Sequence, residues 1–237
     1  MSKWTAQDMV PMDGKTVVVT GGNSGIGYVA CKLLLQNGAK TYIMSRDSQK
    51  SHEAIKRMKE ETGKDSVELI PIDLSDLHSV RKAAEAFLSK ESKLDVLMNN
   101  AGVMLTPTKE LTKDGYDFQF GVNFLAHFHL TSLLLPALLA APAPRVVNVS
   151  SNGHRWTAGT GIEWDTLKGP KKGSFISLFD SITSVKLYGQ SKLGNILHTN
   201  ELARRYGEQG LVAISVHPGL IASDLSRDLG FISRNFM

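Results

Sequence analysis

Six short apolar segments, rich in β-branched residues, recur along the chain, and this repetition limits the fold more than any other feature. They lie at residues 15–20, 40–45, 67–73, 95–102, 145–151 and 212–218. Stretches with helical spacing separate them, at residues 28–38, 48–62, 112–140 and 188–206, and after a predicted N-cap at Ser75. Strands that are apolar on both faces and alternate with helices form covered parallel sheets. We therefore expect an α/β fold with one doubly wound parallel sheet and helices on both faces.

The length and composition of the chain fit a single domain of this kind. Its 237 residues can bury a substantial core, and no linker, internal repeat or low-complexity tract divides them. Hydrophobic residues make up 42% and charged residues 21%, which is ordinary for a soluble globular protein and argues against disorder as the main state. We expect one domain over residues 1–237.

Charge and cysteine content restrict the partners and the compartment. The 27 basic and 23 acidic residues give a net charge of +4 and are scattered, so nucleic-acid binding gains little support. The single cysteine, Cys31, has apolar helical neighbours and is predicted to be a buried packing residue in a reducing compartment. Residues 1–15 lack the apolar core of a secretory signal, which predicts a cytoplasmic protein. The apolar stretch 124–141 contains two histidines, a serine and a proline, which favour a buried helix over a membrane span.

Polar and glycine-rich motifs follow several of the predicted strands. They are the turn 20–27 (TGGNSGIG), Asp73, the segment 99–102 (NNAG) and the pair Ser150–Ser151. Ligands of open parallel sheets bind beyond the carboxyl ends of the strands. Because each motif falls at such an end, we expect them to converge on one rim of the sheet.

The turn 20–27 joins the first strand to the first helix. In that setting glycines let the backbone approach a pyrophosphate, and the helix N-terminus points at it. The spacing of Gly21, Gly25 and Gly27 differs from the common GxGxxG, but the strand–turn–helix context still predicts dinucleotide binding. The predicted contacts within the turn are Gly21, Asn23, Ser24, Gly25, Ile26 and Gly27.

The segment 188–192 (YGQSK) places Tyr188 and Lys192 four residues apart in a predicted helix, so they share a face. A nearby ammonium favours the phenolate and lowers the pKa of a tyrosine, which makes it a usable proton donor. The alternative for this pair alone is a surface aromatic ring beside a solvated lysine. The choice depends on the rest of the chain.

Taken together, these motifs resemble the short-chain dehydrogenase/reductase superfamily, from about residue 15 to residue 225 and in the family's order. The resemblance implies a Rossmann-type fold and a role for Tyr188 as general acid/base. It implies that Lys192 lowers the pKa of the phenol and holds the nicotinamide ribose, and that Ser151 bonds the substrate oxygen. Asn123, in the segment GVNF, would support a water path to the lysine.

The resemblance also implies further cofactor contacts. They are Asp73 and Leu74 at the adenine, Asn99, Ala101 and Gly102 near the adenosine ribose, and Pro218 and Gly219 beside the nicotinamide. Each site residue has a structural alternative, such as a strand-end cap for Ser151, a solvated charge for Lys192 or a plain turn for residues 218–219. The histidines show no metal-ligand spacing, so we expect no metal site.

The connection between the serine and the tyrosine is long, because Ser151 and Tyr188 are 188 − 151 = 37 positions apart. This insertion, residues 152–187, resembles the retinol-dehydrogenase-like branch, which acts on lipophilic alcohols, aldehydes and ketones. It is expected to lie near the substrate pocket. Its aromatic residues either form a wall of that pocket or only pack the loop down; they are Trp156, Trp164, Phe175 and Phe179.

The sequence ends at residue 237, where the family usually continues through a substrate-covering helical segment and a further strand. We therefore expect the C-terminal strand and the substrate lid to be short or missing. This leaves open a dinucleotide-binding protein with a regulatory or scaffolding role and little turnover. A weaker alternative is an epimerase or dehydratase, whose turn usually has a glycine where this chain has Ser24.

The second strand ends at Ser45, where the family's NAD-selecting acid would lie, and Arg46 follows it. A guanidinium can hold the 2′-phosphate of NADP through paired hydrogen bonds. We expect NADP(H) to be preferred, with NAD(H) possible. If the strand ended two residues later, Asp47 would instead bind the ribose; followed by Ser48, however, it also suits the start of the next helix.

Assembly is implied by the same resemblance. The helices at residues 112–140 and 188–206 correspond to helices that pair across subunits in many members of the family. The stretch 124–141 is also more apolar than one face of a sheet requires. We expect a homodimer or homotetramer that acts on a small-molecule carbonyl or alcohol.

Overall fold

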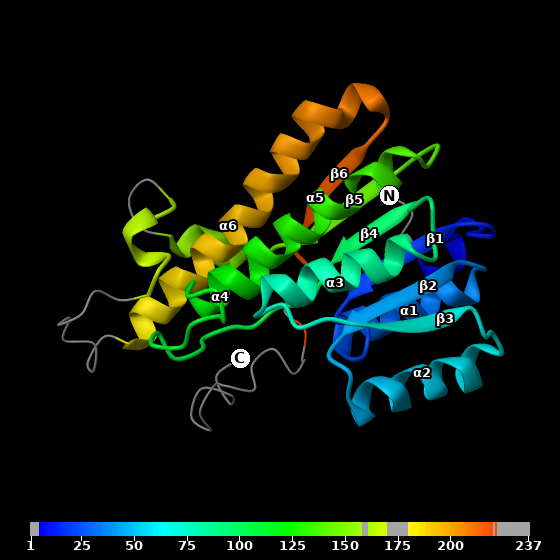
Figure 1. The fold of residues 1–237 in the computed structure, drawn as a ribbon, viewed down its shortest axis with the longest axis horizontal. Helices are drawn as coiled ribbons and strands as arrows, with labels where there is room; N and C mark the ends of the chain where they lie inside the picture. The colour runs from blue at the N-terminus through cyan, green and yellow to red at the C-terminus, as the bar shows by residue number, and fades with distance from the viewer. Residues whose placement is uncertain (1–4, 158–160, 170–179, 220, 222–237) are drawn as a thin grey trace.

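The computed structural model describes residues 5–157, 161–169, 180–219 and 221. Within these residues one parallel sheet has the strand order β3-β2-β1-β4-β5-β6 (Figure 1). The strands are β1 (Thr16–Thr20), β2 (Lys40–Ser45), β3 (Val67–Pro71), β4 (Val96–Asn99), β5 (Arg145–Val149) and β6 (Val212–Val216). The predicted fold class, a Rossmann-type sheet with helices on both faces, is confirmed.

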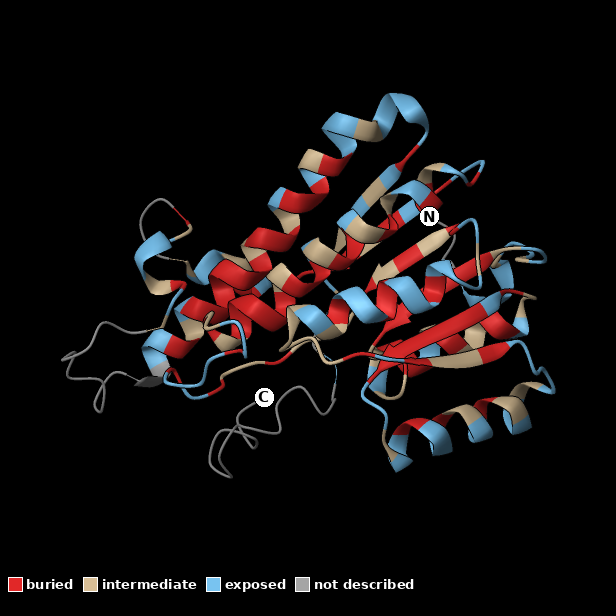
Figure 2. Cartoon of the chain, viewed as in Figure 1, coloured by how far each residue is buried: buried red, intermediate tan, exposed pale blue. Residues whose placement is uncertain are grey.

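Helices cover the two faces of this sheet. They are α1 (Gly25–Gln36), α2 (Gln49–Thr62), α3 (Leu77–Leu88), α4 (Phe118–Phe120), α5 (Ala126–Leu139) and α6 (Asp180–Tyr206). Val17 and Val19 of β1 pack with α1 and α2 in one core cluster, whereas Val18 packs with α3, α5 and α6 in the other. The alternation follows from the two-residue period of a strand. Figure 2 shows the sheet buried between these layers and α2 exposed on its outer side.

The strand order reverses beside β1, which pairs with β2 on one side and β4 on the other. Connections leave the sheet in opposite directions at such a point and open a crevice beyond the strand ends. Val19 of β1 lies opposite Ile43 of β2 and Met98 of β4. The glycine-rich turn after β1 and the NNAG segment at the end of β4 therefore meet, as the sequence predicts.

The prediction of a helix from residue 112 is wrong by about two turns. Leu111 and Asp117 form an isolated β-bridge, and Gly115 between them has a φ of +77°, which a helix does not allow. The helical run begins at α4, where the Asp117 carboxylate accepts a hydrogen bond from the Phe120 N–H at 2.8 Å. Burial raises the pKa of Asp117 to about 6. The N-cap at Asp117, rather than the spacing of apolar residues, determines where this helix begins.

The N-cap of α3 is Asp76 and not the predicted Ser75. The Asp76 carboxylate accepts hydrogen bonds from the backbone N–H groups of His78 and Ser79. The Ser75 hydroxyl instead donates to Asp73 Oδ1 at 2.7 Å. Two neighbouring residues that can both cap a helix are not separated by sequence preference alone.

The apolar stretch predicted as one helix consists of α4, a π-turn called η2 (Gly121–Leu125), and α5. The run Phe118–Leu139 is long and apolar enough to cross a membrane by length and composition, and half of its most apolar window is buried in the fold. Leu130, Leu134 and Leu138 are fully buried in the core cluster shared with α3. This packing favours a core helix of a globular domain.

The remaining described elements are short helical turns. They are η1 (Ala6–Asp8), η3 (Asn152–Trp156), η4 (Trp164–Thr166) and η5 (Gly207–Gln209). Both η3 and η4 belong to the long connection 152–187, of which residues 158–160 and 170–179 lie outside the described part. The expected buried role of Cys31 is confirmed: its side chain is fully buried in α1, and burial raises the pKa of its thiol to about 12.

Candidate active site

The glycine-rich turn after β1 is closed tightly against the NNAG segment. Gly21 has a φ of +67°, and a Cβ at this position would lie 3.1 Å from the Cα of Ala101. A Cβ at Gly27 would lie 2.4 Å from the carbonyl oxygen of Gly21. The amide of Asn100 donates to the Thr20 carbonyl at 2.9 Å and holds the turn closed. Asn100 was missed by sequence reasoning, although the doubled asparagine of NNAG is a visible signal.

The turn leads into the N-terminus of α1. Ser24 precedes the helix with an extended backbone and makes no side-chain cap bond, so the first N–H groups of this 12-residue helix are left for another acceptor. Asn23 donates from its amide to the hydroxyl of Ser51 at 3.1 Å, which ties the turn to α2. Tight glycine backbone followed by an uncapped helix N-terminus fits the pyrophosphate of a dinucleotide. Gly25 and Ile26 open this helix.

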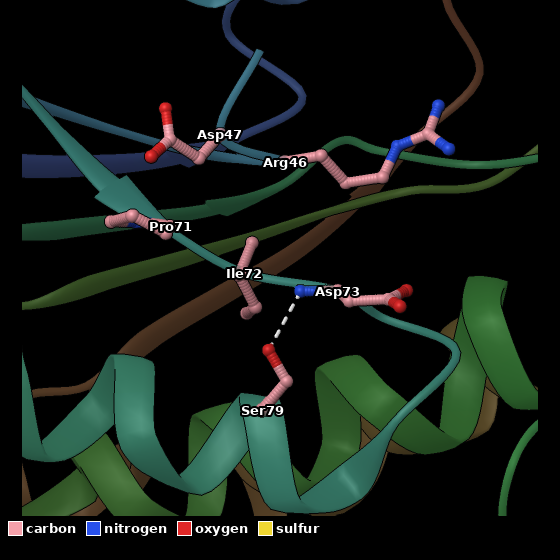
Figure 3. Close-up of a pocket in the computed structure, with 6 residues that line it drawn as sticks. All are labelled: Arg46, Asp47, Pro71, Ile72, Asp73 and Ser79. Atoms are coloured by element: carbon pink, nitrogen blue, oxygen red, sulfur yellow. Dashed lines mark hydrogen bonds between the residues drawn. The ribbon is translucent and has the colours of Figure 1, made fainter.

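A pocket of about 170 Å³ lies beyond the ends of β2 and β3. It is lined by Arg46, Asp47, Pro71, Ile72, Asp73 and Ser79 (Figure 3). Figure 3 shows Arg46 and Asp73 extending the same way, with Asp47 turned in the other direction. Asp47 Oδ1 instead contacts His52 Nε2 at 2.6 Å, in the first turn of α2. The partner of its carboxylate, His52, is not one of the residues that line the pocket.

Asp73 is the acidic residue that faces the pocket. Burial acts to raise the pKa of Asp73, but hydrogen bonds from Ser75 and the charge of Lys113 lower it overall. Its backbone N–H donates to Ser79 Oγ at 2.9 Å. Leu74 beside it packs against the core. Asp73 is therefore a charged group held in place at the end of the rim beside β2 and β3.

The NNAG residues divide between core and rim. Asn99 donates from its amide to Thr131 Oγ1 at 3.0 Å and to Asn148 Oδ1 at 2.8 Å, so its side chain is used inside the fold. Gly102 lies between the turn and the catalytic candidates. A Cβ there would be 3.1 Å from Asn123 Oδ1 and 3.5 Å from Lys192 Nζ. Ala101 and Gly102 face the site, whereas the side chain of Asn99 does not.

Tyr188 and Lys192 lie one turn apart in α6 and are both buried, with exposed fractions of 2% and 3%. Lys192 Nζ lies 5.8 Å from the centre of the Tyr188 ring and donates to the Val149 carbonyl at 2.9 Å. Burial lowers the pKa of Lys192 to about 8. The shared helical face predicted from the sequence is therefore present, in the core rather than on the surface.

The pKa of Tyr188 does not shift as the spacing predicts. Burial raises it, and a hydrogen bond from Ser151 opposes that rise. The expectation of a lowered pKa omitted desolvation, which disfavours a phenolate and an ammonium alike. In this structure Lys192 directs its ammonium at the Val149 carbonyl instead of the phenol oxygen.

Ser151 and the turn that follows it hold the tyrosine ring. Ser151 Oγ accepts a hydrogen bond from the Gly153 N–H at 3.0 Å and begins η3. A Cβ at Gly153 would lie 2.8 Å from Tyr188 Cε1, so the glycine makes room for the ring. Trp156 lies at a ring distance of 6.4 Å from Tyr188, whereas Trp164 is 75% exposed. The other two aromatic candidates, Phe175 and Phe179, lie outside the described residues.

Asn123 lies in the π-turn η2 and is fully buried. Its Oδ1 accepts from the Val103 N–H at 2.8 Å, and its amide donates to the Val103 carbonyl at 2.9 Å and to Ser191 Oγ at 3.0 Å. The side chain therefore connects the loop after NNAG to α6. All four catalytic candidates meet around the ends of β4 and β5.

Supporting residues surround the pair on α6; sequence reasoning placed Ser150 at the rim but missed Asn195 and Gln190. Ser150 Oγ donates to the Lys192 carbonyl at 2.8 Å, and the Asn195 amide donates to the Val149 carbonyl at 3.1 Å. Gln190, within the YGQSK segment, accepts from the Glu163 N–H and donates to Thr166 Oγ1. It fastens η4 to α6. No local pattern in the sequence predicts these contacts, because they join residues that are brought together only by the tertiary fold.

Pro218 and Gly219 follow β6, and Gly219 has a φ of +89°. The end of β6 lies beside Ser150, whose N–H donates to the Val216 carbonyl at 2.8 Å. The two residues are therefore placed near the serine pair, at the rim. In the part of the chain that the structure describes, no group of three or more histidine, cysteine or acidic side chains is arranged to hold a metal ion.

Comparisons with known proteins agree with this arrangement. A family model described as short chain dehydrogenase matches residues 15–160. A short-chain dehydrogenase/reductase of Armillaria gallica is 48% identical over 232 residues, which cover 96% of this chain and 72% of the relative. Retinol dehydrogenase 12 of Mus musculus is 42% identical, with 92% and 65% covered. Retinol dehydrogenase 11 of Homo sapiens is 41% identical, with 98% and 69% covered.

Solved structures share the fold as well. The crystal structure of an uncharacterized protein from Mycobacterium paratuberculosis has 39% sequence identity and a TM-score of 0.76, covering 96% of this chain and 76% of that one. RhlG of Pseudomonas aeruginosa, solved as an NADP active-site complex, has 25% identity and a TM-score of 0.68, with 92% and 77% covered. By its sequence and fold, the chain belongs to the short-chain dehydrogenase/reductase family, within the retinol-dehydrogenase-like branch, and is an oxidoreductase that acts on CH–OH groups.

Proposed function

We propose that the chain is an NADP(H)-dependent oxidoreductase that interconverts a lipophilic or aromatic alcohol and its aldehyde or ketone. The observation that carries this proposal is the buried Tyr188, with the Ser151 hydroxyl acting to lower its pKa and the Lys192 ammonium 5.8 Å from its ring centre. A proton donor, a second oxygen ligand and a positive charge thus lie together at the rim. Carbonyl reduction needs these three groups beside a hydride carrier.

The roles of the side chains follow from their chemistry. A bound nicotinamide supplies or removes hydride at the substrate carbon. In the direction of reduction, the Tyr188 hydroxyl donates a hydrogen bond and then its proton to the substrate oxygen, while Ser151 donates a second hydrogen bond to it. Lys192, as an ammonium, favours the phenolate that remains. Because Tyr188 and Lys192 are buried, their interactions are stronger than they would be at a surface.

The proposed substrate class rests on the relatives and on one described aromatic residue. Two of the relatives are named retinol dehydrogenases, so their printed substrate is a lipophilic alcohol. Trp156 lies beside Tyr188 and leaves 51% of its surface exposed, which offers an apolar contact next to the reacting groups. An apolar or aromatic substrate would cover this surface.

The proposed preference for NADP(H) rests on the charges around the 170 Å³ pocket. Arg46 extends into this region, and Asp47 pairs with His52 instead (Figure 3). Ser45 presents no charge and shares a hydrogen bond with Ser51 at 3.0 Å. Asp73 also faces this pocket as a carboxylate, but the guanidinium of Arg46 can hold a 2′-phosphate through paired hydrogen bonds. The structure of RhlG with NADP agrees with this proposal.

The experiment that tests the function is a substrate screen with the purified chain. NADPH and NADH are offered with aliphatic and aromatic aldehydes and ketones, and NADP⁺ and NAD⁺ with the matching alcohols, while nicotinamide absorbance is followed. We expect faster turnover with the phosphorylated cofactor and with apolar substrates. Tight cofactor binding with no turnover on any substrate would favour the regulatory or scaffolding alternative.

We also propose that the chain forms a homodimer or homotetramer through α5 and α6. Phe128 on α5 and Leu197 on α6 are 45% and 49% exposed, and Phe128 packs against His198 at a ring distance of 5.1 Å. The two helices thus share an apolar outer surface, which is typical of interfaces. Light scattering at micromolar concentration tests the proposal, and a monomer would refute it.

A further inference from the structure

His127 on α5 is a buried histidine to which the mechanism above gives no role. Its exposed fraction is 1%. Nδ1 lies 3.0 Å from the main-chain carbonyl oxygen of Asn123, and Nε2 lies 2.8 Å from Thr20 Oγ1. The imidazole therefore touches two parts of the site that are far apart in the sequence: the catalytic π-turn and the residue that begins the glycine-rich turn.

The direction of each hydrogen bond in this contact is fixed. A carbonyl only accepts, so Nδ1 carries the proton and Nε2 must accept from the Thr20 hydroxyl. Thr20 Oγ1 in turn accepts from the N–H groups of Asn100 at 2.9 Å and Ala101 at 3.0 Å. Its single hydroxyl proton is left for His127, because the Met98 carbonyl is a weaker acceptor at 3.5 Å. One continuous series of polarised hydrogen bonds therefore runs from the NNAG backbone through Thr20 and His127 to Asn123.

Electrostatics keep these hydrogen bonds in a single arrangement. Burial lowers the pKa of His127 to about 4; the hydrogen bond to the Asn123 carbonyl acts to raise it, and the nearby Lys192 and His198 act to lower it further. The ring is therefore neutral at physiological pH, with one tautomer selected by the Asn123 carbonyl. A charged ring would donate from both nitrogens and would lose its acceptor for Thr20.

The Asn123 carbonyl is the part of this residue left to act on the site. Its side chain is already occupied by both backbone groups of Val103 and by Ser191. The carbonyl belongs to a π-turn, in which the Ala126 N–H bonds back to Gly121 rather than to the residue four positions earlier. The Asn123 carbonyl lies within this widened turn, and its contact with His127 Nδ1 at 3.0 Å constrains its direction.

We propose that His127 is a positioning residue that fixes the main-chain carbonyl of Asn123 relative to the glycine-rich turn. Through Thr20 it makes the geometry of the cofactor turn and that of the proton-handling residues depend on each other. This role rests on the proposed function, because it concerns turnover at the same site. An ordinary core histidine would support only the stability of the fold.

Two substitutions separate the two contacts of the ring. The amide of asparagine reaches the position of Nδ1, so His127→Asn keeps a donor to Asn123 and loses the contact with Thr20. The amide of glutamine reaches the position of Nε2, so His127→Gln keeps the Thr20 contact and loses the donor to Asn123. His129→Gln, two residues away and half-buried, is the matched control.

We expect different losses from the two variants. His127→Gln should lower kcat about tenfold with less than about a threefold change in the Kd of NADPH, because one hydrogen bond to a reacting element is lost. His127→Asn should raise that Kd about tenfold and lower kcat less. Thr20→Val should raise that Kd at least as much as His127→Asn, because it also removes the acceptor for the Asn100 and Ala101 N–H groups. Adding His127→Asn to Thr20→Val should cost little more than Thr20→Val alone. The control should change neither quantity.

Parallel losses of kcat, cofactor affinity and Tm in both histidine variants would overturn the proposal, as would no loss in either. Nitrogen NMR of the unsubstituted protein with labelled histidine tests the same contacts without a mutation. We expect a neutral ring protonated at Nδ1 from pH 5 to pH 8; an Nε2–H tautomer, or titration near the ordinary pKa of about 6.5, would also overturn it. If no carbonyl or alcohol substrate is turned over, the proposed function fails, while NADPH affinity and NMR still decide the role of His127.

Discussion

The two ends of the rim are built differently. At the end beside β2 and β3, where we propose that the adenosine binds and which we call the adenosine end, Arg46 and Asp47 are exposed, and Asp47 makes a local contact with His52. At the catalytic end, Asn123 is fully buried and Lys192 is 3% exposed, and each bonds to backbone groups of the core. Changes at the adenosine end should therefore alter cofactor choice with little cost in stability. Substitutions at the catalytic end should alter both turnover and the free energy of unfolding.

The largest effect is expected from Tyr188→Phe, which removes the proposed proton donor and keeps the ring packed against Gly153 and Trp156. Turnover should fall by about 10²–10⁴-fold, the range for lost acid/base catalysis, while NADPH still binds. Steady-state rates and a cofactor titration measure the two quantities. Near-normal turnover in this variant would remove Tyr188 from the mechanism.

Asn123→Ala should lower the stability of the fold as well as affect a residue of the candidate catalytic set. It leaves the N–H and carbonyl of Val103 without their partner, and buried unpaired groups cost roughly 2–4 kcal/mol of unfolding free energy in total. Urea unfolding measures this loss, with the exposed Asn200→Ala on α6 as control. Equal stability of the two variants would contradict the comparison between the ends of the rim.

Arg46→Ala should act on affinity alone. A lost charged hydrogen bond weakens NADPH binding by about 10–100-fold, and NADH binding should be nearly unchanged because NADH lacks the 2′-phosphate. Isothermal titration with both cofactors, together with Tm, tests this at the adenosine end. Tighter binding of NADH than NADPH to the unsubstituted protein would reverse the proposed preference.

A pH-dependent effect is expected at the catalytic end from His198, which packs against Phe124 and Phe128. Burial lowers its pKa to about 4, so below about pH 6.5 the unfolded chain gains a proton that the folded chain lacks. This group therefore reduces stability as pH falls from 6.5 to 4, by roughly 1–3 kcal/mol. Asp117, whose pKa is raised to about 6, contributes with the opposite sign.

The comparison of His198→Gln with the unsubstituted protein isolates that contribution, since Asp117 is present in both. Unfolding free energies at pH 7 and pH 4.5 should differ less in the variant. An equal difference in the two proteins would show that His198 does not titrate as its burial implies.

The smallest effect is expected from Asp47→Asn. Because this carboxylate pairs with His52 and is turned away from the pocket, the ratio of NADPH to NADH affinity should change by less than about threefold. Titration with both cofactors is again the measurement. A collapse of NADH binding would identify Asp47 as a ribose ligand and overturn the assignment of this loop.

Sequence reasoning located the strands well because strand formation leaves a local signal. The predicted strand ending at Ser45 ends there in the structure, and Ser48 caps α2. Errors occurred where two polar residues compete for one role, as with Ser75 and Asp76, or where a glycine interrupts an apolar period, as with Gly115. Local pattern does not rank such competitors.

In the candidate site too, features with a local sequence signal were predicted and features that depend on tertiary contacts were not. Motif order was enough to predict that Tyr188 and Lys192 share a face, but the direction of the tyrosine pKa depends on burial, which spacing does not reveal. Gly153 and His127 make their contacts with residues tens of positions away, at Tyr188 and Thr20. Such partners become visible only when the strands are assembled into a sheet.

The π-turn at Gly121–Leu125 has a consequence for how this helix tolerates change. An α-helix advances about 100° per residue, and a π-turn inserts one additional residue into that rotation. Asn123 can therefore face the loop at Val103 while Leu130 and Leu134 face the sheet core. Deleting one residue within the turn would restore an ordinary helix but rotate one of these two faces out of place. The turn acts as an angular spacer, and its length is constrained even where its side chains are replaceable.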